Sequence, residues 1–256
     1  MSETTIPLTT ISPEGHPEEQ QPLTSAEDED SPQTNMPFKD VYQKAVGRKG
    51  DVFAQVAAIA SLAVLVGVTW FIALWNPAGL FTWHPLCQSL GIALISYGVL
   101  TLQPTSQPRT KAAGLIRHQI AMIVLGYPIL LIGTAAVSYN KYLGGRSHFT
   151  SWHGTIGIIT IALTLFQVGL GAGSVWFNGR LFGGNPKAKL VWKYHRASGY
   201  LLFPLYLFTT YLGGAWSNYT EKYTVFFVRL LAYFVAPVVL AIAVYSRVRL
   251  SKMNFF

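Results

Sequence analysis

The stretch Phe81-Thr-Trp-His84-Pro-Leu-Cys-Gln-Ser-Leu-Gly91 places a histidine in the first turn of a strongly apolar segment. An unpaired imidazole inside hydrocarbon is costly, so a histidine at such a position usually faces the interior of a helix bundle and has a partner. Three further apolar segments carry a histidine near their start: His118, His153 and His195. Four equivalent positions suggest axial ligands of haem iron.

The composition points to the membrane and away from a soluble domain. Of the 256 residues, 51% are hydrophobic and only 12% are charged, with 15 Phe, 13 Tyr and 7 Trp. Soluble domains carry about 25% charged residues, so this chain is expected to be a polytopic membrane protein. Cys87 is the single cysteine, which leaves no internal disulfide and no thiolate metal cluster.

Six apolar segments are each long enough to cross a ~30 Å hydrocarbon layer. They cover residues 52–75, 82–102, 113–138, 152–177, 194–216 and 224–246. With this topology, 15 of the 19 Lys and Arg lie in the two termini and in the second and fourth loops. The opposite loops hold Lys141, Arg146 and Lys222. The positive-inside rule therefore predicts that both termini are cytoplasmic.

Residues 1–50 are expected to form a disordered acidic tail in the cytoplasm. The first 38 residues contain eight acids, no Lys or Arg, many Pro, Ser and Thr, and no apolar period on which a core could be built. A basic region followed by an apolar stretch is missing after Met1, so a cleaved signal peptide is not expected. Residues 51–250 are then the predicted transmembrane domain.

The predicted topology sorts the histidines by depth. The segments that hold His84 and His153 begin on the non-cytoplasmic face, whereas those that hold His118 and His195 begin on the cytoplasmic face. We therefore expect an all-α bundle of six transmembrane helices, in which helices 2 to 5 form a four-helix core with two bis-histidine haem sites. Such iron passes electrons without binding oxygen.

Other interpretations of the four histidines remain open at this point. They could be unrelated interfacial side chains, or they could serve a membrane carrier of metal ions, since imidazole also binds zinc and copper. A proton-coupled transporter lacks its usual carboxylate relay here, because the membrane region contains only Asp51 and Glu221 as acids. Ferric reductases of the oxidase type place two histidines on one helix, and no predicted helix has two.

Small residues could let a flat ligand lie against the helices. Gly114 precedes His118 by four residues, while Gly157 and Gly199 follow His153 and His195 by four, so each shares a helical face with its histidine. These three glycines are predicted to pack against haem. Close helix packing is the alternative, and it would account on its own for Gly169, Gly171 and Gly173.

Four motifs in the same order carry a resemblance to a known family. They are Trp83-His84-Pro85, Trp152-His153-Gly154, Ala188-Lys-Leu and Tyr194-His195-Arg-Ala-Ser198-Gly199. Over about residues 50–250 the chain resembles the eukaryotic cytochrome b561 family, and within it the standalone six-helix members of the domain-containing protein 2 type. The resemblance implies two haem b groups, held by His84 with His153 and by His118 with His195.

The resemblance also implies a reaction. Family members carry electrons from cytoplasmic ascorbate across the membrane to monodehydroascorbate or ferric iron, which makes them transmembrane oxidoreductases. The expected partners are thus ascorbate or a similar reductant, a ferric chelate or monodehydroascorbate, and the lipid bilayer. A two-fold homodimer is the default assembly, nucleic acid is not an expected partner, and the sequence does not distinguish an endomembrane from the plasma membrane.

Cations near the histidines are candidates for binding anionic substrates. The cytoplasmic candidates are Arg109, Lys111, Arg117, Lys189, Lys193 and Arg196. On the other side the candidate binding residues are Lys141 and Arg146 together with the neighbouring Tyr142 and His148. Their alternative role is to set the topology. The sequence departs from the family in two places: the lysines upstream of the helix 3 histidine are in a different register, and Cys87-Gln88 replaces a common methionine.

Arg229 is a cation about one turn inside the last predicted helix. Its long stem could carry the charge to the membrane surface. The alternative is an ion pair between the guanidinium and a carboxylate of the haem near the non-cytoplasmic face, which would keep the charge inside the bundle.

Overall fold

The computed structural model describes residues 50–103 and 108–248. Residues 1–49, in which the acidic tail was predicted, lie outside the described residues, as do 104–107 and 249–256. The disorder of the tail therefore stays a prediction.

The described part of the chain folds into helices and contains no strand, which confirms the all-α prediction. The long elements are α2 (Asp51–Trp75), α3 (Trp83–Leu100), α4 (Pro108–Gln119), η3 (Ile120–Gly126), α5 (Tyr127–Leu143), α6 (Trp152–Val175), α7 (Asn185–Trp216) and α10 (Ala236–Tyr245). Shorter ones are η2 (Gly79–Thr82), η4 (Trp176–Phe182), α8 (Asn218–Tyr223), α9 (Phe226–Leu230) and η5 (Leu231–Val235).

Two of these elements, η3 and η5, are π-helical turns inside otherwise continuous helices. Each lies just before a proline, Pro128 in α5 and Pro237 in α10. Proline has no backbone N–H and its ring crowds the preceding turn, so a wider turn relieves the clash. The helices accommodate these two prolines with π turns, while Pro204 lies inside the unbroken α7.

Within residues 50–103 and 108–248, four helical segments are long and apolar enough to cross a membrane: Asp51–Trp75, Arg109–Leu143, Trp152–Phe182 and Phe226–Tyr245. The predicted spans 82–102 and 194–216 correspond to α3 and α7. Both helices are less apolar than the other four segments, because α3 begins with His84 and Gln88 and the first half of α7 carries several Lys and Arg.

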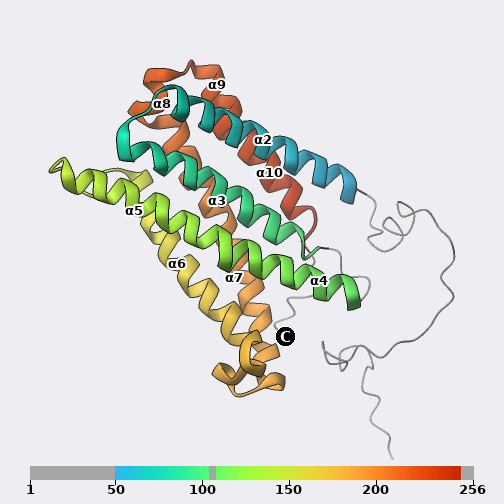
Figure 1. Cartoon of the computed structure of the whole chain (residues 1–256). Coiled ribbons are helices and arrows are strands. Elements are labelled where there is room, and N and C mark those ends of the chain that lie inside the picture. Colours follow the sequence, from blue (N-terminus) through green and yellow to red (C-terminus); the bar gives the residue numbers. More distant parts are fainter. Residues whose placement is uncertain (1–49, 104–107, 249–256) are drawn as a thin grey trace, which may run out of the picture. The chain divides into compact units, whose positions relative to one another are not determined.

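The helices pack mainly in pairs along the chain (Figure 1). α3 packs against α5 and η3, forming one antiparallel hairpin, and α6 packs against α7, forming a second. α2 lies against α10 and α3, and the main apolar core joins them to α5 and α7 through residues such as Ala58, Ile92, Phe203 and Leu240. Direct close contacts between the two hairpins are sparse.

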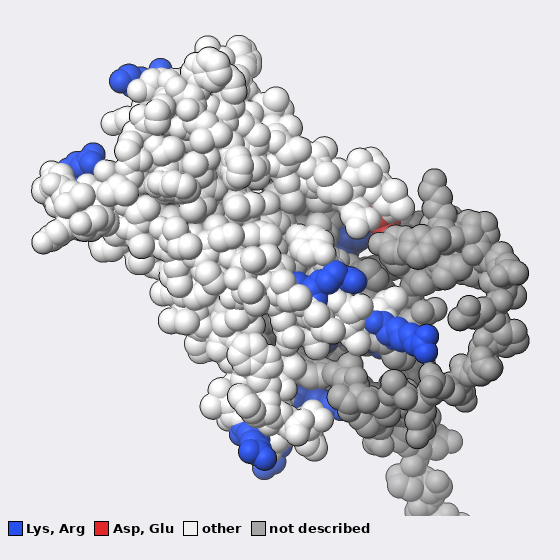
Figure 2. Space-filling model, viewed as in Figure 1, with Lys and Arg blue, Asp and Glu red and all other residues white. Residues whose placement is uncertain are grey.

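Charged side chains lie mostly near the helix ends. On the face shown in Figure 2, Lys and Arg gather toward the ends of the described helices and leave an uncharged band between them. One ion pair joins the first and last long helices, from the Arg247 guanidinium after α10 to the Asp51 carboxylate at the start of α2. This pair ties the bundle together at one end.

Candidate functional site

Two histidines from different hairpins meet near the start of α3 and α6. His84 is the second residue of α3 and His153 the second residue of α6. Their ring centroids are 5.8 Å apart and their planes make an angle of 81°. Ser151 caps α6 by accepting a hydrogen bond from the Gly154 N–H, which fixes where the helix begins and hence where the His153 side chain points.

A second pair forms between the other two helices. His118 lies in the last turn of α4 and His195 in α7, and their ring centroids are 6.2 Å apart with an interplanar angle of 87°. The structure thus brings His84 to His153 and His118 to His195, the two pairs that depth in the membrane predicts. Each pair takes one histidine from each hairpin.

The spacing of each pair suits one metal ion between two imidazoles. Bonds of about 2 Å from opposite sides of an ion place the ring centroids roughly 6 Å apart. Among the described residues, no group of three or more His, Cys, Asp and Glu side chains comes together. Each pair offers two imidazole nitrogens. Haem iron needs only two donors from the protein, because the porphyrin supplies the others, so the donor set fits haem.

Backbone carbonyls orient three of the four imidazoles. The Nδ1–H groups of His84, His118 and His153 donate to the carbonyl oxygens of Gly133, Gly98 and Thr209, at 3.1, 3.0 and 2.9 Å respectively. A proton held on Nδ1 leaves the lone pair of Nε2 for a metal, and the hydrogen bond fixes the ring plane. These contacts favour a ligand role over a purely structural one.

His195 is held differently. Its Nδ1 is buried and has no hydrogen-bond partner in the described part of the chain. Its backbone carbonyl instead accepts a hydrogen bond from Nε2 of Gln167, and the Oε1 of Gln167 accepts one from Ser198 Oγ at 2.7 Å. Gln167 therefore links α6 to the turn of α7 that carries His195, a connection that the sequence did not reveal.

A glutamine also supports the His84 site. Gln88, one turn after His84 in α3, donates from Nε2 to the Leu130 carbonyl and to Thr134 Oγ1, both at 3.0 Å. This part of α5 presents the Gly133 carbonyl that receives the His84 proton. Gln88 thereby fixes the acceptor of the imidazole, which is the usual role of a residue behind a metal ligand.

Glycines lie directly against two of the imidazoles. A Cβ on Gly213 of α7 would lie 2.5 Å from Cε1 of His153, and a Cβ on Gly171 of α6 would lie 2.8 Å from Cε1 of His195. Neither position tolerates a side chain without moving the ring. Gly171 was predicted to serve close helix packing, and nothing in the sequence singles out Gly213. Both glycines are far along the chain from the histidines they touch, so the sequence does not indicate these contacts.

The predicted haem-packing glycines have other neighbours in the structure. A Cβ on Gly114 would meet the Thr101 carbonyl at 2.6 Å, one on Gly199 would meet Nε2 of Gln167 at 2.8 Å, and one on Gly157 would lie 3.5 Å from Thr209. These contacts agree with close helix packing. A role against haem stays a prediction for all three.

The predicted substrate-binding residues form two groups. Arg109, Lys111 and Arg117 are exposed on α4, and Lys189, Lys193 and Arg196 are half-buried on α7. In the last turn of α5, the half-buried Lys141 donates from Nζ to the Ser147 carbonyl at 3.1 Å, and Tyr142 is exposed, as are Arg146 and His148 in the loop that follows. Their roles stay predictions.

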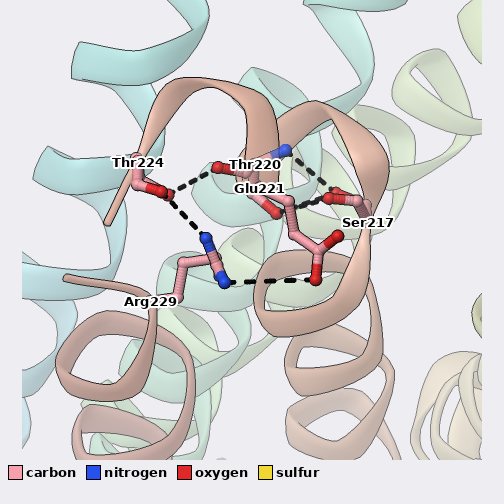
Figure 3. A network of polar contacts seen from close by, with 5 residues as sticks. All are labelled: Ser217, Thr220, Glu221, Thr224 and Arg229. Atoms are coloured by element: carbon pink, nitrogen blue, oxygen red, sulfur yellow. Dashed lines mark hydrogen bonds and ion pairs between the residues drawn. The ribbon is translucent and has the colours of Figure 1, made fainter. Parts of the chain in front are cut away.

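Arg229 has partners within the chain (Figure 3). Its Nη1 donates to the Thr224 carbonyl at 2.8 Å, and its Nη2 lies 4.0 Å from Oε1 of Glu221. The guanidinium therefore connects α9 to α8. The sequence suggests the membrane surface and a haem carboxylate as partners of this cation, and it does not predict these two contacts within the chain. The contact was hard to foresee because Glu221 and Arg229 belong to different helices with a bend between them.

Comparisons with known proteins identify the family. The family model described as eukaryotic cytochrome b561 matches residues 83–221, which include all four paired histidines. The chain is 29% identical to the transmembrane reductase CYB561D2 of Bos taurus over 178 residues, which cover 63% of this chain and 79% of the relative. The corresponding protein of Mus musculus is 30% identical over 61% of this chain and 77% of its own.

A third relative has a name that includes its electron donor. The transmembrane ascorbate-dependent reductase CYB561 of Sus scrofa is 30% identical over 108 residues, which cover 42% of each chain. The family match extends over more than half of the sequence and contains both imidazole pairs, so this chain belongs to the eukaryotic cytochrome b561 family and is similar to its CYB561D2-type members.

Proposed function

We propose that this protein is a transmembrane oxidoreductase that moves electrons from ascorbate, or a similar reductant, on the cytoplasmic side to monodehydroascorbate or ferric iron on the other side. The observation that carries the proposal is the pairing of four imidazoles across the two hairpins, three of them oriented by backbone carbonyls. Members of the cytochrome b561 family are haem b proteins. When bound, haem supplies an iron that is reduced and reoxidised by one electron.

His84 with His153 and His118 with His195 would hold one haem each. The carbonyls of Gly133, Gly98 and Thr209 keep three of these imidazoles in the tautomer that binds a metal. The chain would thus supply two haem sites at different depths in the membrane. An electron would then cross a ~30 Å apolar layer in several short steps and not in one long step. The closed apolar bundle around them blocks the passage of ascorbate itself.

The proposed topology has six spans, with α3 and α7 added to the four most apolar segments, and both termini in the cytoplasm. In this arrangement residues 51–250 form the transmembrane domain and 1–50 its cytoplasmic tail. α4 and the start of α7 then lie on the cytoplasmic side, where their cations would attract an anionic reductant.

Vesicle transport measures the whole proposed reaction. Purified protein should contain about two haems per chain by pyridine-haemochrome analysis, as two bis-histidine sites require. Sealed vesicles with ascorbate on the cytoplasmic-equivalent side should reduce external ferricyanide or chelated ferric iron, and vesicles without protein should not. Haem-replete protein that carries no electrons across would rule out the proposed function, and a spectrum without a reducible Soret band would favour a metal-ion carrier instead.

Neutralising cytoplasmic cations should weaken the use of ascorbate. We expect the Lys111→Gln, Arg117→Gln double variant to raise the apparent KM for ascorbate several-fold, because each exposed charge pair contributes about 0.2–1 kcal/mol, and to reduce its salt dependence. Stopped-flow reduction of haem measures both. Lys141→Gln, on the opposite side in the proposed topology, is the matched control. Equal KM values in the double variant and the control would indicate that these cations do not bind ascorbate and only set the orientation of the helices in the membrane.

A further inference from the structure

Three aromatic side chains extend from His84 to the protein surface on α8. The ring of Phe81, in η2, lies 6.0 Å from the His84 ring between centroids. The Phe81 ring is 5.1 Å from that of Tyr219, and the Tyr219 ring is 5.3 Å from that of Tyr223, both pairs edge to face. These separations are those of aromatic rings in contact. Phe81, Tyr219 and Tyr223 are called the aromatic row below.

Burial falls along the aromatic row. Phe81 and Tyr219 are half-buried, whereas Tyr223 is 39% exposed. Burial, together with the nearby Tyr223 phenol, raises the pKa of Tyr219 above its ordinary value, so the phenol stays neutral at physiological pH. The row therefore connects the half-buried imidazole of His84 to solvent through uncharged rings.

The position of α8 is fixed by several hydrogen bonds. The Tyr219 hydroxyl donates to the Asn76 carbonyl at 2.7 Å, which ties α8 to the end of α2. Ser217 caps α8 by accepting from the Thr220 N–H at 3.3 Å. Arg229 donates to the Thr224 carbonyl at the other end of α8 and faces Glu221 (Figure 3). A six-residue helix held at both ends keeps the two tyrosine rings in place.

The outer end of the aromatic row carries a positive charge. Lys222 is exposed, and its Nζ lies over the Tyr223 ring at 5.1 Å from the centroid. The neighbouring carboxylate of Glu221 faces Arg229 instead. An ammonium over an exposed ring offers an anion both a charge and a flat surface.

We propose that electrons leave the protein through the aromatic row and reach an anionic one-electron acceptor docked at Lys222 and Tyr223. The proposal rests on the proposed function and adds the acceptor site to it. Each transfer moves one electron. Ascorbate supplies it on the cytoplasmic side and releases one proton to water there as it becomes monodehydroascorbate, and the acceptor gains the electron, as when ferricyanide becomes ferrocyanide. The three rings end each transfer unchanged, and no proton passes along them. The predicted acceptor residues at the end of α5 and in the loop after it are the alternative docking site.

Variants of Tyr219 test the row. Tyr219→Leu removes the middle ring and should slow reduction of external ferricyanide at saturating concentration by roughly tenfold or more, the size of a 1.4 kcal/mol barrier. Haem content, the visible spectrum and haem reduction by ascorbate should stay at wild-type values. Tyr219→Phe keeps the ring and loses only the hydroxyl bonds to the Asn76 and Ile72 carbonyls, so it should transfer electrons at the wild-type rate. A merely structural tyrosine would show the reverse, with Tyr219→Phe impaired.

Lysine variants test the docking site. Lys222→Gln should raise the KM for ferricyanide several-fold with little change in kcat, because charge in an exposed site acts mainly on encounter and binding. Hexacyanocobaltate, a redox-inert anion of the same shape, should bind the wild-type protein in calorimetry and bind Lys222→Gln more weakly. Arg180→Gln is the matched control, because Arg180 is an exposed cation outside both candidate sites, and both of its values should match wild type.

The outcomes separate this proposal from the proposed function. Wild-type vesicles that reduce no external ferricyanide would overturn both. Transport by wild type with full rates in Tyr219→Leu would overturn the aromatic row alone. A raised KM and weakened anion binding in Lys141→Gln, with Lys222→Gln unchanged, would move the docking site to the end of α5 and the loop after it.

Discussion

His84→Ala is expected to bind about one haem per chain, against the two expected of the wild type, because each proposed haem site would need both of its histidines. The reason is the geometry of the pairs: His84 faces only His153 at 5.8 Å, and His118 faces His195 at 6.2 Å. His153→Ala should lose the same spectral component as His84→Ala. His118→Ala and His195→Ala should both lose the other component.

Redox titration followed by visible spectroscopy measures these losses. His148→Ala provides the control, because this histidine is exposed after α5 and should leave both components intact. If His84→Ala and His195→Ala lost the same component, the pairing in the structure would be wrong. Acid acetone should also extract all of the haem, since the sequence contains no Cys-x-x-Cys-His attachment motif.

Gly213→Ala should damage the His84–His153 site while leaving the protein folded. The added Cβ would lie 2.5, 2.7 and 3.1 Å from Cε1, Nδ1 and Nε2 of His153, whose ring is held by the Thr209 carbonyl. Overpacking of this kind costs about 1–3 kcal/mol, which corresponds to roughly 5- to 150-fold weaker binding. Alanine also favours a helix over glycine by ~1 kcal/mol, so α7 itself should not lose stability.

Two further glycine variants make the experiment specific. Gly171→Ala should weaken the other haem site, because its Cβ would lie 2.8 Å from the His195 ring. Gly169→Ala, one half-turn away on the same helix, meets nothing within 4 Å and should bind both haems as the wild type does. Haem content and the two spectral components measure each case. Equal loss in all three variants would indicate a general effect of glycine replacement on helix packing.

The pairing of the histidines could be predicted from the sequence because hydrophobicity determines depth. His84, His118, His153 and His195 each lie near the start of an apolar segment, and alternating segments begin on opposite faces. This rule needs no knowledge of side-chain packing. The all-α fold followed in the same way from the length and apolar character of the segments.

The surroundings of the histidines could not be predicted in this way. The carbonyls that accept from the imidazoles belong to other helices, and every residue has a carbonyl, so the sequence contains no sign of which one is used. Gly171 and Gly169 look equivalent in the sequence, yet one touches an imidazole and the other touches nothing. Such differences depend on the rotation of α6 about its axis relative to α7.

Bends between short helices also limit what can be predicted from the sequence. Arg229 meets Glu221 and Thr224 because the chain turns between α8 and α9, which brings residues of consecutive helices face to face. The aromatic row has the same origin, since Phe81 and Tyr219 are far apart in the sequence and meet only where η2 and α8 lie together. Periodicity describes one helix at a time and does not predict these contacts.

The division into hairpins affects how stable such a protein is without haem. Each imidazole pair takes one side chain from the α3–α5 hairpin and one from the α6–α7 hairpin, and these hairpins have few direct close contacts. The apolar core already connects the hairpins through residues such as Ile92 and Phe203. In the proposed holoprotein each haem would add a second connection, so haem-free chains are expected to unfold at a lower temperature and to be cleaved faster by proteases than haem-loaded ones.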